Sequence, residues 1–484
     1  MNWWALKRRI HVSWLIAIAC SGFFVGVFTA QYLNIYILSS FVFLLISVML
    51  IGLSIFGRHV YLMPVLIIGS VLLGLWRGTV STVDLAQFKP MYGYQISVTG
   101  MVKDDVDSGT SDQIVIRLDD LIINDKSLPG VLWISASSAD VKRGDKLVVS
   151  GKLKEGFGNF AGVMYRATVD TIIHPQPGDT ARLVRDWFAD LVQMAIPEPE
   201  SSWGLGYLVG QRRSLPADLA LALQIAGLTH VVVASGYNLT ILVRLARRLF
   251  VKVSKYLSAL SASVMIVAFM AITGMSPSMS RAGLVAGLSL AAWYYGRQFH
   301  PIILLSIAVA VTVMINPSYA WGDLGWQLSF AAFAGVMIIA PLAQRYFFGD
   351  KKLGFVPQIL VETVSAQVAT VPIIVAAFGQ LSNVAVITNL LVLPLVPLAM
   401  LLTFIAGIGA LILPFAAGII GLPATWLLGY MVNVAELAAS LPWASSNLQL
   451  SGWGVVICYV MIIGFCWYMW RVAKFNLRGS NLVE

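Results

Sequence analysis

Residues 227–240 read Gly-Leu-Thr-His-Val-Val-Val-Ala-Ser-Gly-Tyr-Asn-Leu-Thr and place His230, Ser235 and Asn238 inside an apolar run long enough to enter a lipid bilayer. Hydrocarbon offers a polar side chain no hydrogen bonds, so such a group must face a partner or a water-filled path. This stretch therefore indicates a membrane-embedded fold, and it marks the part of the chain in which function is expected.

The composition of the whole chain is that of a membrane protein. Hydrophobic residues make up 58% of the 484 residues and charged residues only 11%, against roughly a quarter charged in an average soluble domain. The three cysteines lie in apolar segments, so neither a disulfide framework nor a cysteine-rich metal site is indicated. We expect no metal and no cofactor.

Windows of about 20 residues predict about twelve membrane spans. Three precede residue 80, and nine follow residue 218. Pro372, Pro394 and Pro397 each remove a backbone donor, so some spans are expected to be broken or re-entrant. The fold class is thus a polytopic α-helical membrane protein, with spans near 14–33, 35–55, 60–77, 219–243, 257–274, 281–296, 302–316, 324–344, 356–378, 384–413, 418–440 and 451–471.

Residues 80–195 differ in composition, with 15 acidic residues, 12 basic residues and frequent Gly and Pro. Alternating apolar and polar residues predict five strands, at about 94–103, 113–123, 130–135, 145–153 and 160–172. Five short strands with glycine-rich corners are typical of a small β-barrel, and an OB-like fold is expected. The predicted domains are N-terminal helices over 1–79, a β domain over 80–180, an amphipathic or re-entrant connector over 181–217 and a second transmembrane domain over 218–484.

Lysine and arginine in short loops mark the cytoplasmic side of a membrane protein. Here the basic residues precede the first predicted span and then recur in alternate loops. We therefore expect a protein of the cytoplasmic (inner) membrane, with both termini in the cytoplasm and the β domain outside. Most of the net charge of +9 comes from basic residues that this topology places in the cytoplasm. They are Lys7, Arg8, Arg9, Arg58, Arg244, Arg247, Arg248, Lys252, Lys255, Arg297, Arg345, Lys351, Lys352, Arg471, Lys474 and Arg478.

The predicted β domain combines a local basic patch with an acidic background. The 12 basic and 15 acidic residues of 80–195 leave a net charge of −3, so bulk charge alone would not hold a phosphate backbone. Six basic side chains are candidates for a local nucleic-acid contact: Lys142, Arg143, Lys146, Lys152, Lys154 and Arg166. Phe157, Phe160 and Tyr165 would add stacking faces. A solvated barrel rim is the alternative explanation of the same residues.

Polar clusters interrupt the apolar sequence of the second transmembrane domain. Gly227, His230, Ala234 and Asn238 fall on one helical stripe, with Ser235 on its edge. In the next cluster Thr273 precedes a Gly and a Pro that break the helix, and Ser276, Ser278 and Arg281 follow. Broken helices at membrane depth expose backbone donors that can meet anions.

Arg281 stands alone among the short outer loops after residue 218 as a basic residue, so topology does not explain it. It is the leading candidate for a phosphate contact, with an ion pair to Asp323 as the alternative. The remaining clusters could each be helix–helix hydrogen bonds, but together they predict a lined path. They comprise Asp323, Trp326 and Gln327; Glu362, Gln367, Thr370 and Pro372; and Gln380, Ser382, Asn383 and Asn389, with Arg212 and Arg213 near the outer mouth.

Several of these segments resemble, in order, the motifs of the ComEC family of competence DNA-uptake channels. The matching pieces are residues 206–216 (Gly-Tyr-Leu-Val-Gly-Gln-Arg-Arg-Ser-Leu-Pro), 226–238, 273–282 (Thr-Gly-Met-Ser-Pro-Ser-Met-Ser-Arg-Ala), 325–330 (Gly-Trp-Gln-Leu-Ser-Phe) and 372–394. Residues 144–153 look like part of the family's outer OB-like domain. The resemblance extends from about residue 60 to residue 440.

Two departures from the family pattern matter. Many relatives have a histidine where this chain has Asn238, which excludes a catalytic histidine at that position. Larger relatives also carry a C-terminal metallo-β-lactamase-like nuclease, but this sequence has five histidines and no His-x-His-x-Asp-His arrangement. Any strand degradation is therefore expected to need another protein.

The resemblance implies a channel, not an enzyme, that imports single-stranded DNA across the cytoplasmic membrane during natural transformation. Moving phosphates inward against an inside-negative potential costs about 2.3 kcal/mol per charge per 100 mV, and the sequence has no Gly-x-x-x-x-Gly-Lys-[Ser/Thr] loop to drive it. The expected partners are single-stranded DNA, the lipid bilayer, a separate nuclease, a cytosolic ATPase, helicase or strand-binding protein, and an outer DNA receptor. The DNA path would be lined by His230, Ser235, Asn238, Thr273, Ser276, Ser278, Arg281, Asp323, Trp326, Gln327, Gln367, Thr370, Gln380 and Asn383, with Arg212, Arg213, Lys142, Arg143, Lys152, Lys154 and Arg166 where DNA first meets the protein.

Two other functions fit parts of the sequence. A transporter or flippase of another polar or anionic substrate would also use polar clusters in broken helices. An intramembrane serine protease would use Ser235 as its nucleophile. For that protease the base is poorly placed, because His230 lies about 140° around the same predicted helix.

Overall fold

The computed structural model describes residues 11–33, 35–108, 113–137, 139–176, 178–211, 216–232, 235–296, 300–349, 351 and 353–473. Its contacts divide the chain into unit 1 (Met1–Asp179 with Ile302–Gln327) and unit 2 (Thr180–Pro301 with Leu328–Glu484). Each unit is described by itself below.

Eight helices in the described residues are long and apolar enough to cross a bilayer, as expected of a multipass membrane protein. They are Val12–Ala30, Val60–Met91, Lys255–Thr273, Leu324–Phe348, Phe355–Phe378, Ala385–Ile412, Pro414–Ala439 and Gly452–Ala473. The pair Asp218–Ile225 and Thr229–Phe250 is bent by 109° and would make a ninth, broken span. The number of twelve spans therefore stays a prediction.

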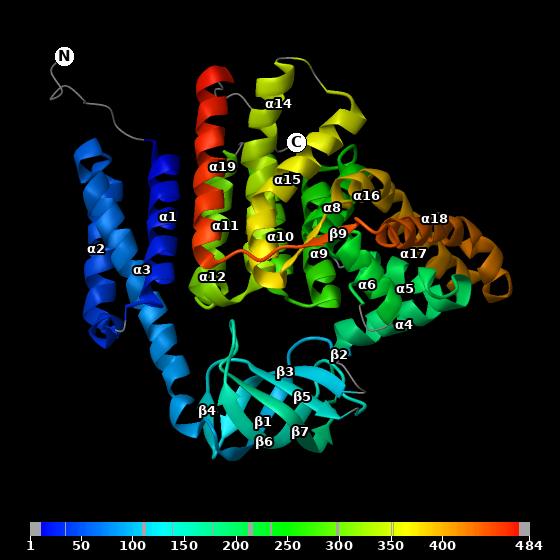
Figure 1. Cartoon of the computed structure of the whole chain (residues 1–484), viewed down its shortest axis with the longest axis horizontal. Coiled ribbons are helices and arrows are strands. Elements are labelled where there is room, and N and C mark those ends of the chain that lie inside the picture. The colour runs from blue at the N-terminus through cyan, green and yellow to red at the C-terminus, as the bar shows by residue number, and fades with distance from the viewer. Residues whose placement is uncertain are drawn as a thin grey trace. The chain divides into compact units, whose positions relative to one another are not determined.

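The helices of unit 1 pack through small residues. α3 lies between α1 and α2 (Figure 1), and α1 and α3 touch backbone to backbone. A Cβ atom added at Gly26 would lie 2.1 Å from the Val71 carbonyl oxygen, and one at Gly74 would lie 2.1 Å from that of Phe23. Glycine is what allows membrane helices to approach this closely. The elements are α1 (Val12–Ala30), η2 (Tyr36–Ser39), α2 (Phe41–Gly57), η3 (Val60–Leu62), α3 (Met63–Ala86), η4 (Lys89–Met91), α11 (Pro301–Ile315) and α12 (Tyr319–Gly322).

The β domain of unit 1 is a closed five-stranded barrel, which confirms the five predicted strands. The ring runs β1–β3–β5–β7–β6 and back to β1, and every pair in it is antiparallel except β5 with β7. Two short strands extend it. The strands are β1 (Gln95–Val102), β2 (Asp107–Ser108), β3 (Gln113–Ile123), β4 (Lys126–Leu128), β5 (Leu132–Ser137), β6 (Lys146–Glu155) and β7 (Gly162–Ile173).

Alternation along the strands fills the barrel. Inward-facing side chains such as Ile116, Leu118, Ile134 and Leu147 are fully buried, and Phe88 closes the same core from the chain segment before β1. Burying each aliphatic side chain stabilises the fold by about 1.5–3 kcal/mol. The outward positions of the same strands are left free to carry polar and aromatic side chains.

Asp119 in β3 is a polar side chain that the barrel accommodates poorly. Its Oδ1 is buried without a hydrogen-bond partner among the described residues, and burial, opposed by the charge of Lys103, raises the pKa of the carboxyl. Because the folded-state pKa lies above the unfolded one, ionised Asp119 destabilises the barrel at neutral pH, and this penalty disappears as the pH falls through the folded-state pKa.

We expect Asp119→Asn to raise the melting temperature at neutral pH and to reduce the gain in stability on acidification. Thermal melts of the full chain in detergent between pH 4 and pH 8, roughly the range in which a raised aspartate pKa acts, would measure both. Asp140→Asn provides the control, because it removes an exposed carboxylate of the same domain whose contact with Lys142 at 3.8 Å is also exposed, and it should change neither. A lower melting temperature for Asp119→Asn than for the native chain at neutral pH would contradict this account.

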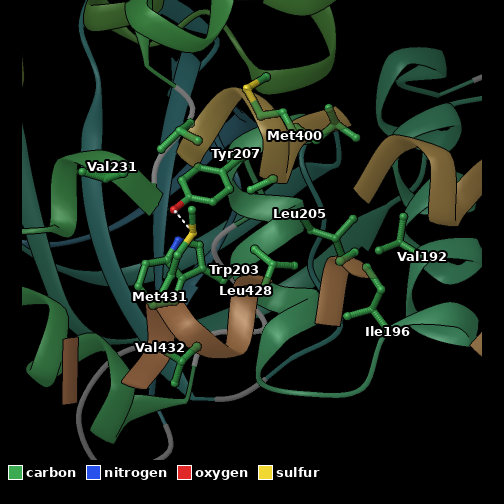
Figure 2. Packing of buried hydrophobic residues seen from close by; sticks show 14 of the residues in the cluster. Val192, Ile196, Trp203, Leu205, Tyr207, Val231, Met400, Leu428, Met431 and Val432 are labelled. Carbon is green, nitrogen blue, oxygen red and sulfur yellow. Dashed lines mark hydrogen bonds between the residues drawn. The ribbon is translucent and has the colours of Figure 1, made fainter. Parts of the chain in front are cut away.

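Unit 2 is built from helices around one that is wholly buried. Every residue of α5 from Ser201 to Val209 is buried, and Trp203 and Tyr207 lie at its centre. The Tyr207 hydroxyl lies 3.5 Å from the sulfur of Met431 in α18 (Figure 2). In the predicted connector the amphipathic pattern is therefore confined to α4, which has one buried and one exposed face, and does not extend through α5.

The elements of unit 2 follow the chain in two stretches. The first contains α4 (Thr180–Ala195), α5 (Glu200–Val209), α6 (Ala217–Ile225), α7 (Thr229–Val232), α8 (Gly236–Phe250), α9 (Lys255–Thr273) and α10 (Pro277–Tyr294). The second contains α13 (Leu324–Ala334), which begins in unit 1, the π-helical turn η5 (Gly335–Ile339), α14 (Ala340–Phe348), α15 (Phe355–Phe378), β8 (Gln380–Ser382), α16 (Ala385–Val392), η6 (Leu393–Leu395), α17 (Val396–Ile412), η7 (Pro414–Ala416), α18 (Ala417–Ala439), β9 (Ser445–Asn447) and α19 (Gly452–Ala473).

The segment from Gly227 to Asn238 is broken, and the prediction of one continuous helical stripe is wrong. Gly227 has a φ of +72° and follows the end of α6, while Ser235 is extended and precedes α8. Hydroxyl groups from the β8–α16 segment satisfy the freed carbonyl groups: Ser382 donates to the Ile225 oxygen and Thr388 to the Ala226 oxygen, each at 2.7 Å. His230 therefore does not share a helix face with Asn238.

Candidate functional site

Two helices of unit 2 begin next to each other and bring polar residues together. A Cβ atom added at Gly236, the first residue of α8, would lie 3.0 Å from Nη2 of Arg281 in α10. Arg281 Nε donates to Ser329 Oγ in α13 at 2.7 Å, and Ser329 Oγ lies 3.2 Å from Ser278 Oγ. We call these residues the Arg281 cluster: Ser235, Gly236, Asn238, Ser278, Arg281 and Ser329.

Local sequence explains why both helices start here. Gly274, with a φ of +86°, ends α9, and Ser276 caps α10 by accepting the Met279 N–H at 3.3 Å. At the start of α8 the Ser235 hydroxyl makes no capping bond and donates instead to Asn238 Oδ1 at 3.3 Å. Helix N-termini carry a partial positive charge from their free N–H groups, so the cluster combines a guanidinium with two such ends.

The surroundings of Arg281 hold the guanidinium without neutralising it. The group lies over the rings of Phe330 and Phe333, 5.7 and 5.3 Å from their centroids, in cation–π geometry. No carboxylate forms an ion pair with it in the part of the chain that the structure describes. A partly buried cation beside two positive helix ends has a strong preference for an anion.

Asn238 is placed as a structural residue. It is 1% exposed, and its Nδ2 donates to the Tyr207 carbonyl oxygen at 3.2 Å. The amide thereby ties the start of α8 to the buried helix α5. Asn238 supports the Arg281 cluster from its buried side. Ser235 is half-buried and lies nearer the exposed side of the cluster.

Asp323, the alternative partner for Arg281, is engaged within unit 1. Its Oδ1 accepts the Trp326 N–H at 2.7 Å, and its Oδ2 accepts Nδ2 of Asn159 at 2.9 Å. Burial raises the pKa of this carboxyl, and the bond from the Trp326 N–H acts in the opposite direction. Both oxygens have partners, which argues against the predicted alternative of an ion pair with Arg281.

Two further predicted lining residues are corrected by their contacts in unit 1. Trp326 is 4% exposed, its ring stacks on Phe24 at a centroid distance of 5.9 Å and its Nε1 donates to Thr312 Oγ1 at 3.0 Å. Gln327 donates to the Ala320 carbonyl oxygen at 3.4 Å. These side chains hold α12 and α13 in place, and Trp326 presents no free face for a base to stack on.

The other predicted lining residues do not join the cluster through any bond in the described chain. Thr273 and Thr370 bond to carbonyl groups one turn back in their own helices. Gln380 and Asn383 hold the two-stranded β8–β9 sheet through Ser445, Ser446 and the Trp443 carbonyl. Gln367 has a buried Oε1 without a partner among the described atoms, beside an apolar pocket of about 400 Å³ between α15, α16 and α19, and His230 is exposed.

On the barrel the predicted basic patch is reduced by one member. Arg143 is 6% exposed and donates from Nε to Asp179 Oδ2 at 2.6 Å, so it is a buried ion pair and not a phosphate contact. Lys142, Lys152, Lys154 and Arg166 are exposed. Arg212 and Arg213 lie outside the described residues.

Aromatic side chains cluster on the outside of the barrel. Phe157 and Tyr165 are each 50% exposed. Trp133 in β5 lies between them, with centroid distances of 5.8 Å to Phe157 and 5.4 Å to Tyr165, and Phe160 lies 5.3 Å from Phe157. Lys154 Nζ is 5.2 Å from the Tyr165 ring. We call Trp133, Phe157, Phe160 and Tyr165 the aromatic face.

Sequence reasoning missed Ser329 and Trp133. Ser329 is within the quoted motif of residues 325–330 and follows Trp326 by three positions, a helical spacing that indicates a shared side of α13. Trp133 alternates with the buried Leu132 and Ile134 in a predicted strand, which indicates an outward position. In both cases the sequence pattern indicates where the side chain points, but it does not indicate which residues the side chain contacts.

Comparison with known proteins gives one family and one relative. A family model described as "Competence protein" matches residues 207–474, more than half of the chain. ComE operon protein 3 of Bacillus subtilis (strain 168) is 25% identical over 250 residues, which cover 49% of this chain and 31% of the relative. The match thus spans less than a third of that relative's length. No solved structure matches the chain. With its five ordered motifs and this family match, the chain belongs to the ComEC family of competence proteins.

Proposed function

We propose that the protein provides the path by which single-stranded DNA crosses the cytoplasmic membrane during natural transformation. Membership of a competence family supports a role in DNA uptake. The observation that carries the proposal further is the Arg281 cluster, in which a guanidinium and two helix N-termini lie together without a neutralising carboxylate among the described residues. Backbone phosphates are anions that such a site suits.

The geometry favours contact with phosphate over contact with bases. Arg281 donates from Nε to Ser329, and no hydrogen bond from its Nη groups is found among the described residues, so these groups can meet an anion. Gly236 leaves room for Nη2 at the start of α8 because it has no side chain. Hydroxyl groups of Ser235 and Ser278 add neutral donors. Such a set holds successive phosphates without reading sequence, as transport of any DNA requires.

The finer arrangement in the membrane is part of the same proposal. Eight long apolar helices, a broken pair and two shorter apolar helices (Phe41–Gly57 and Pro301–Ile315) support about twelve spans. The ring of the barrel, in which the third and fifth main strands are parallel neighbours, supports an OB-like Greek-key barrel. Loop charges support a topology with both termini in the cytoplasm and the barrel outside. Domains over 1–79, 80–180, 181–217 and 218–484 remain the proposed division by sequence.

The protein would act as a channel and not as an enzyme. The Ser235 hydroxyl is bonded to an amide oxygen rather than to a base, which does not favour a nucleophile. Energy and strand degradation would come from separate proteins: a cytosolic ATPase, helicase or strand-binding protein, and a nuclease. An outer DNA receptor would deliver the duplex.

The test is the fate of labelled DNA in cells with and without this protein. Duplex DNA labelled along both strands is offered to each, and cytosolic DNA is examined for strandedness. We expect single-stranded label in the cytosol of cells that contain the protein and none in the deletion strain. Normal uptake in the deletion strain, with loss of export of a lipid-linked precursor instead, would favour a flippase.

A further inference from the structure

The turn between α17 and α18 is apolar throughout. Residues 404–424, which end α17, form η7 and begin α18, include no polar or charged side chain. Three of them are well exposed: Ile412 to 68%, Phe415 to 88% and Ile419 to 73%. Turns that reach water normally contain polar residues, whereas a segment that is hydrophobic all round is typical of burial in a membrane.

Both ends of the α16–α18 segment meet at one small sheet. β8 precedes α16 and β9 follows α18, and the two strands pair, with Gln380 opposite Asn447. α15 leads to β8 from the basic loop at residues 345–352, and α19 leads from β9 to Arg471. Both helices are long enough to cross a bilayer. In the proposed topology, in which basic loops are cytoplasmic, the β8–β9 sheet therefore lies on the outer side.

If α17 and α18 each crossed the bilayer from that side, their turn would be a cytoplasmic loop. The other cytoplasmic loops of the proposed topology after residue 218 contain basic residues, at 244–255, 297 and 345–352. The sequence has no lysine or arginine between Lys352 and Arg471. The charge pattern thus gives no support to a cytoplasmic position for this turn.

Contacts with α4 indicate the membrane depth of the end of α17. A Cβ atom added at Gly407 would lie 2.7 Å from Cζ of Phe188 and 2.9 Å from Cγ2 of Val192. Asp190, between these two residues of α4, is exposed. An exposed carboxylate is costly in hydrocarbon, so this part of α4 has to lie close to water. Because α4 begins at Thr180, soon after the barrel, that water is on the outer side in the proposed topology.

The remaining length of α17 is too short to reach the cytoplasm from this level. Gly407 lies a little more than one turn before the end of α17 at Ile412, a distance of about 7.5 Å along the helix axis. The hydrocarbon core is about 30 Å thick. Figure 1 also shows α17 and α18 running at a steep angle to α15 and α19, so the hairpin gains little depth along its length.

The backbone of the turn is suited to a lipid environment. The Leu413 N–H donates to the Gly409 carbonyl oxygen at 2.8 Å, and the Ala416 N–H donates to the Leu413 carbonyl oxygen at 3.0 Å. Pro414, between them, has no N–H to satisfy. Backbone groups at membrane depth need partners within the protein because lipid offers none, and these groups have them.

We propose that α17 and α18 form a re-entrant hairpin whose tip, residues 411–420, is inserted in the lipid of the outer leaflet. The proposal rests on the topology proposed with the function, and it assigns lipid hydrocarbon as the partner of the tip. A protein partner would cover one side of the turn, whereas exposed apolar residues lie before, within and after it. Because such a hairpin enters and leaves on one side, two predicted spans become one re-entrant pair and both termini stay in the cytoplasm.

The first measurement identifies what surrounds the tip in the full chain, with Cys20, Cys458 and Cys466 replaced by alanine. A nitroxide is attached to Phe415→Cys in proteoliposomes, and its collisions with oxygen and with a water-soluble nickel chelate are compared by electron paramagnetic resonance. Oxygen concentrates in lipid, so we expect collisions with oxygen to dominate. Ile419→Cys reports on the same surface if Phe415→Cys does not fold.

The second measurement identifies the side of the membrane, and both measurements have matched controls. Val460→Cys is an exposed position near the middle of α19 and should resemble Phe415→Cys in its collisions. A membrane-impermeant maleimide is applied to right-side-out and to inverted membrane vesicles. It should label Lys126→Cys in the barrel only in the first, Lys252→Cys only in the second and Phe415→Cys in neither.

Three results would overturn the proposal. Labelling of Phe415→Cys in inverted vesicles would show that the hairpin crosses the membrane, and labelling in right-side-out vesicles would show that its tip lies in water outside. Few collisions with either oxygen or the chelate would show that protein covers the tip. Failure of the proposed topology looks different, because it would exchange the labelling of Lys126→Cys and Lys252→Cys. Loss of the role in DNA uptake would leave all of these readouts unchanged.

Discussion

Replacing Arg281 by alanine is expected to reduce transformation by about 100-fold, the loss of roughly one hydrogen-bonded charge pair with phosphate, while the amount of protein in the membrane is unchanged. The guanidinium contributes the one full positive charge of the Arg281 cluster, and its described partners are a serine hydroxyl and two rings. Without it, two helix N-termini and hydroxyl groups remain, and these hold an anion more weakly.

Two replacements at the same position separate charge from packing. Arg281→Met keeps most of the side-chain volume over Phe330 and Phe333 and should lose transport as alanine does. Arg281→Lys keeps the charge without the planar fork, and its transformation frequency should fall between those of the native protein and Arg281→Met. Lys252→Ala, which removes an exposed charge between α8 and α9, serves as the control and should transform normally. Transformation frequency, normalised to membrane protein, is the measurement; a normal frequency for Arg281→Ala and Arg281→Met would rule out the phosphate role.

Gly74→Leu is expected to prevent the packing of α1 on α3, with a loss of more than about 3 kcal/mol of stability, at the upper end for overpacked cores. A side chain at Gly74 would meet the Phe23 carbonyl oxygen at 2.1 Å and the Val27 nitrogen at 2.8 Å. Both contacts are backbone atoms, which cannot rotate away, so the helices would have to separate.

The matched control is Gly52→Leu in α2, where no heavy atom lies within 4 Å of the added Cβ. Both changes add the same side chain to an apolar helix of unit 1, so they differ in packing and not in hydrophobicity. Thermal stability in detergent and resistance of the membrane-bound chain to protease would distinguish them. Equal stability of the two variants would show that α1 and α3 are not in backbone contact.

Local sequence determined much of this protein. Alternation identified the five barrel strands to within a few residues because the period of two follows directly from one buried and one exposed face. Length and apolarity identified the eight long apolar helices of the described residues, and the ordered motifs identified the family. The break near Gly227 was not predicted. The polar residues there are spaced as on a helix, but Gly227, with its positive φ, and the extended Ser235 interrupt that helix.

Tertiary structure decided which polar residues meet. The sequence alone allows an ion pair between Arg281 and Asp323. In the structure Asp323 accepts from Asn159, and Arg281 donates to Ser329. Residue type made Trp326 and Arg143 candidates for DNA contact. Both are buried instead, because Trp326 donates to Thr312 and Arg143 pairs with Asp179. Trp133 joined the aromatic face only through the pairing of β5 with β7. Periodicity indicates whether a side chain is buried, and this is a property of one segment. A binding site depends instead on which segments pack together. That packing is determined by long-range contacts, which no single segment encodes.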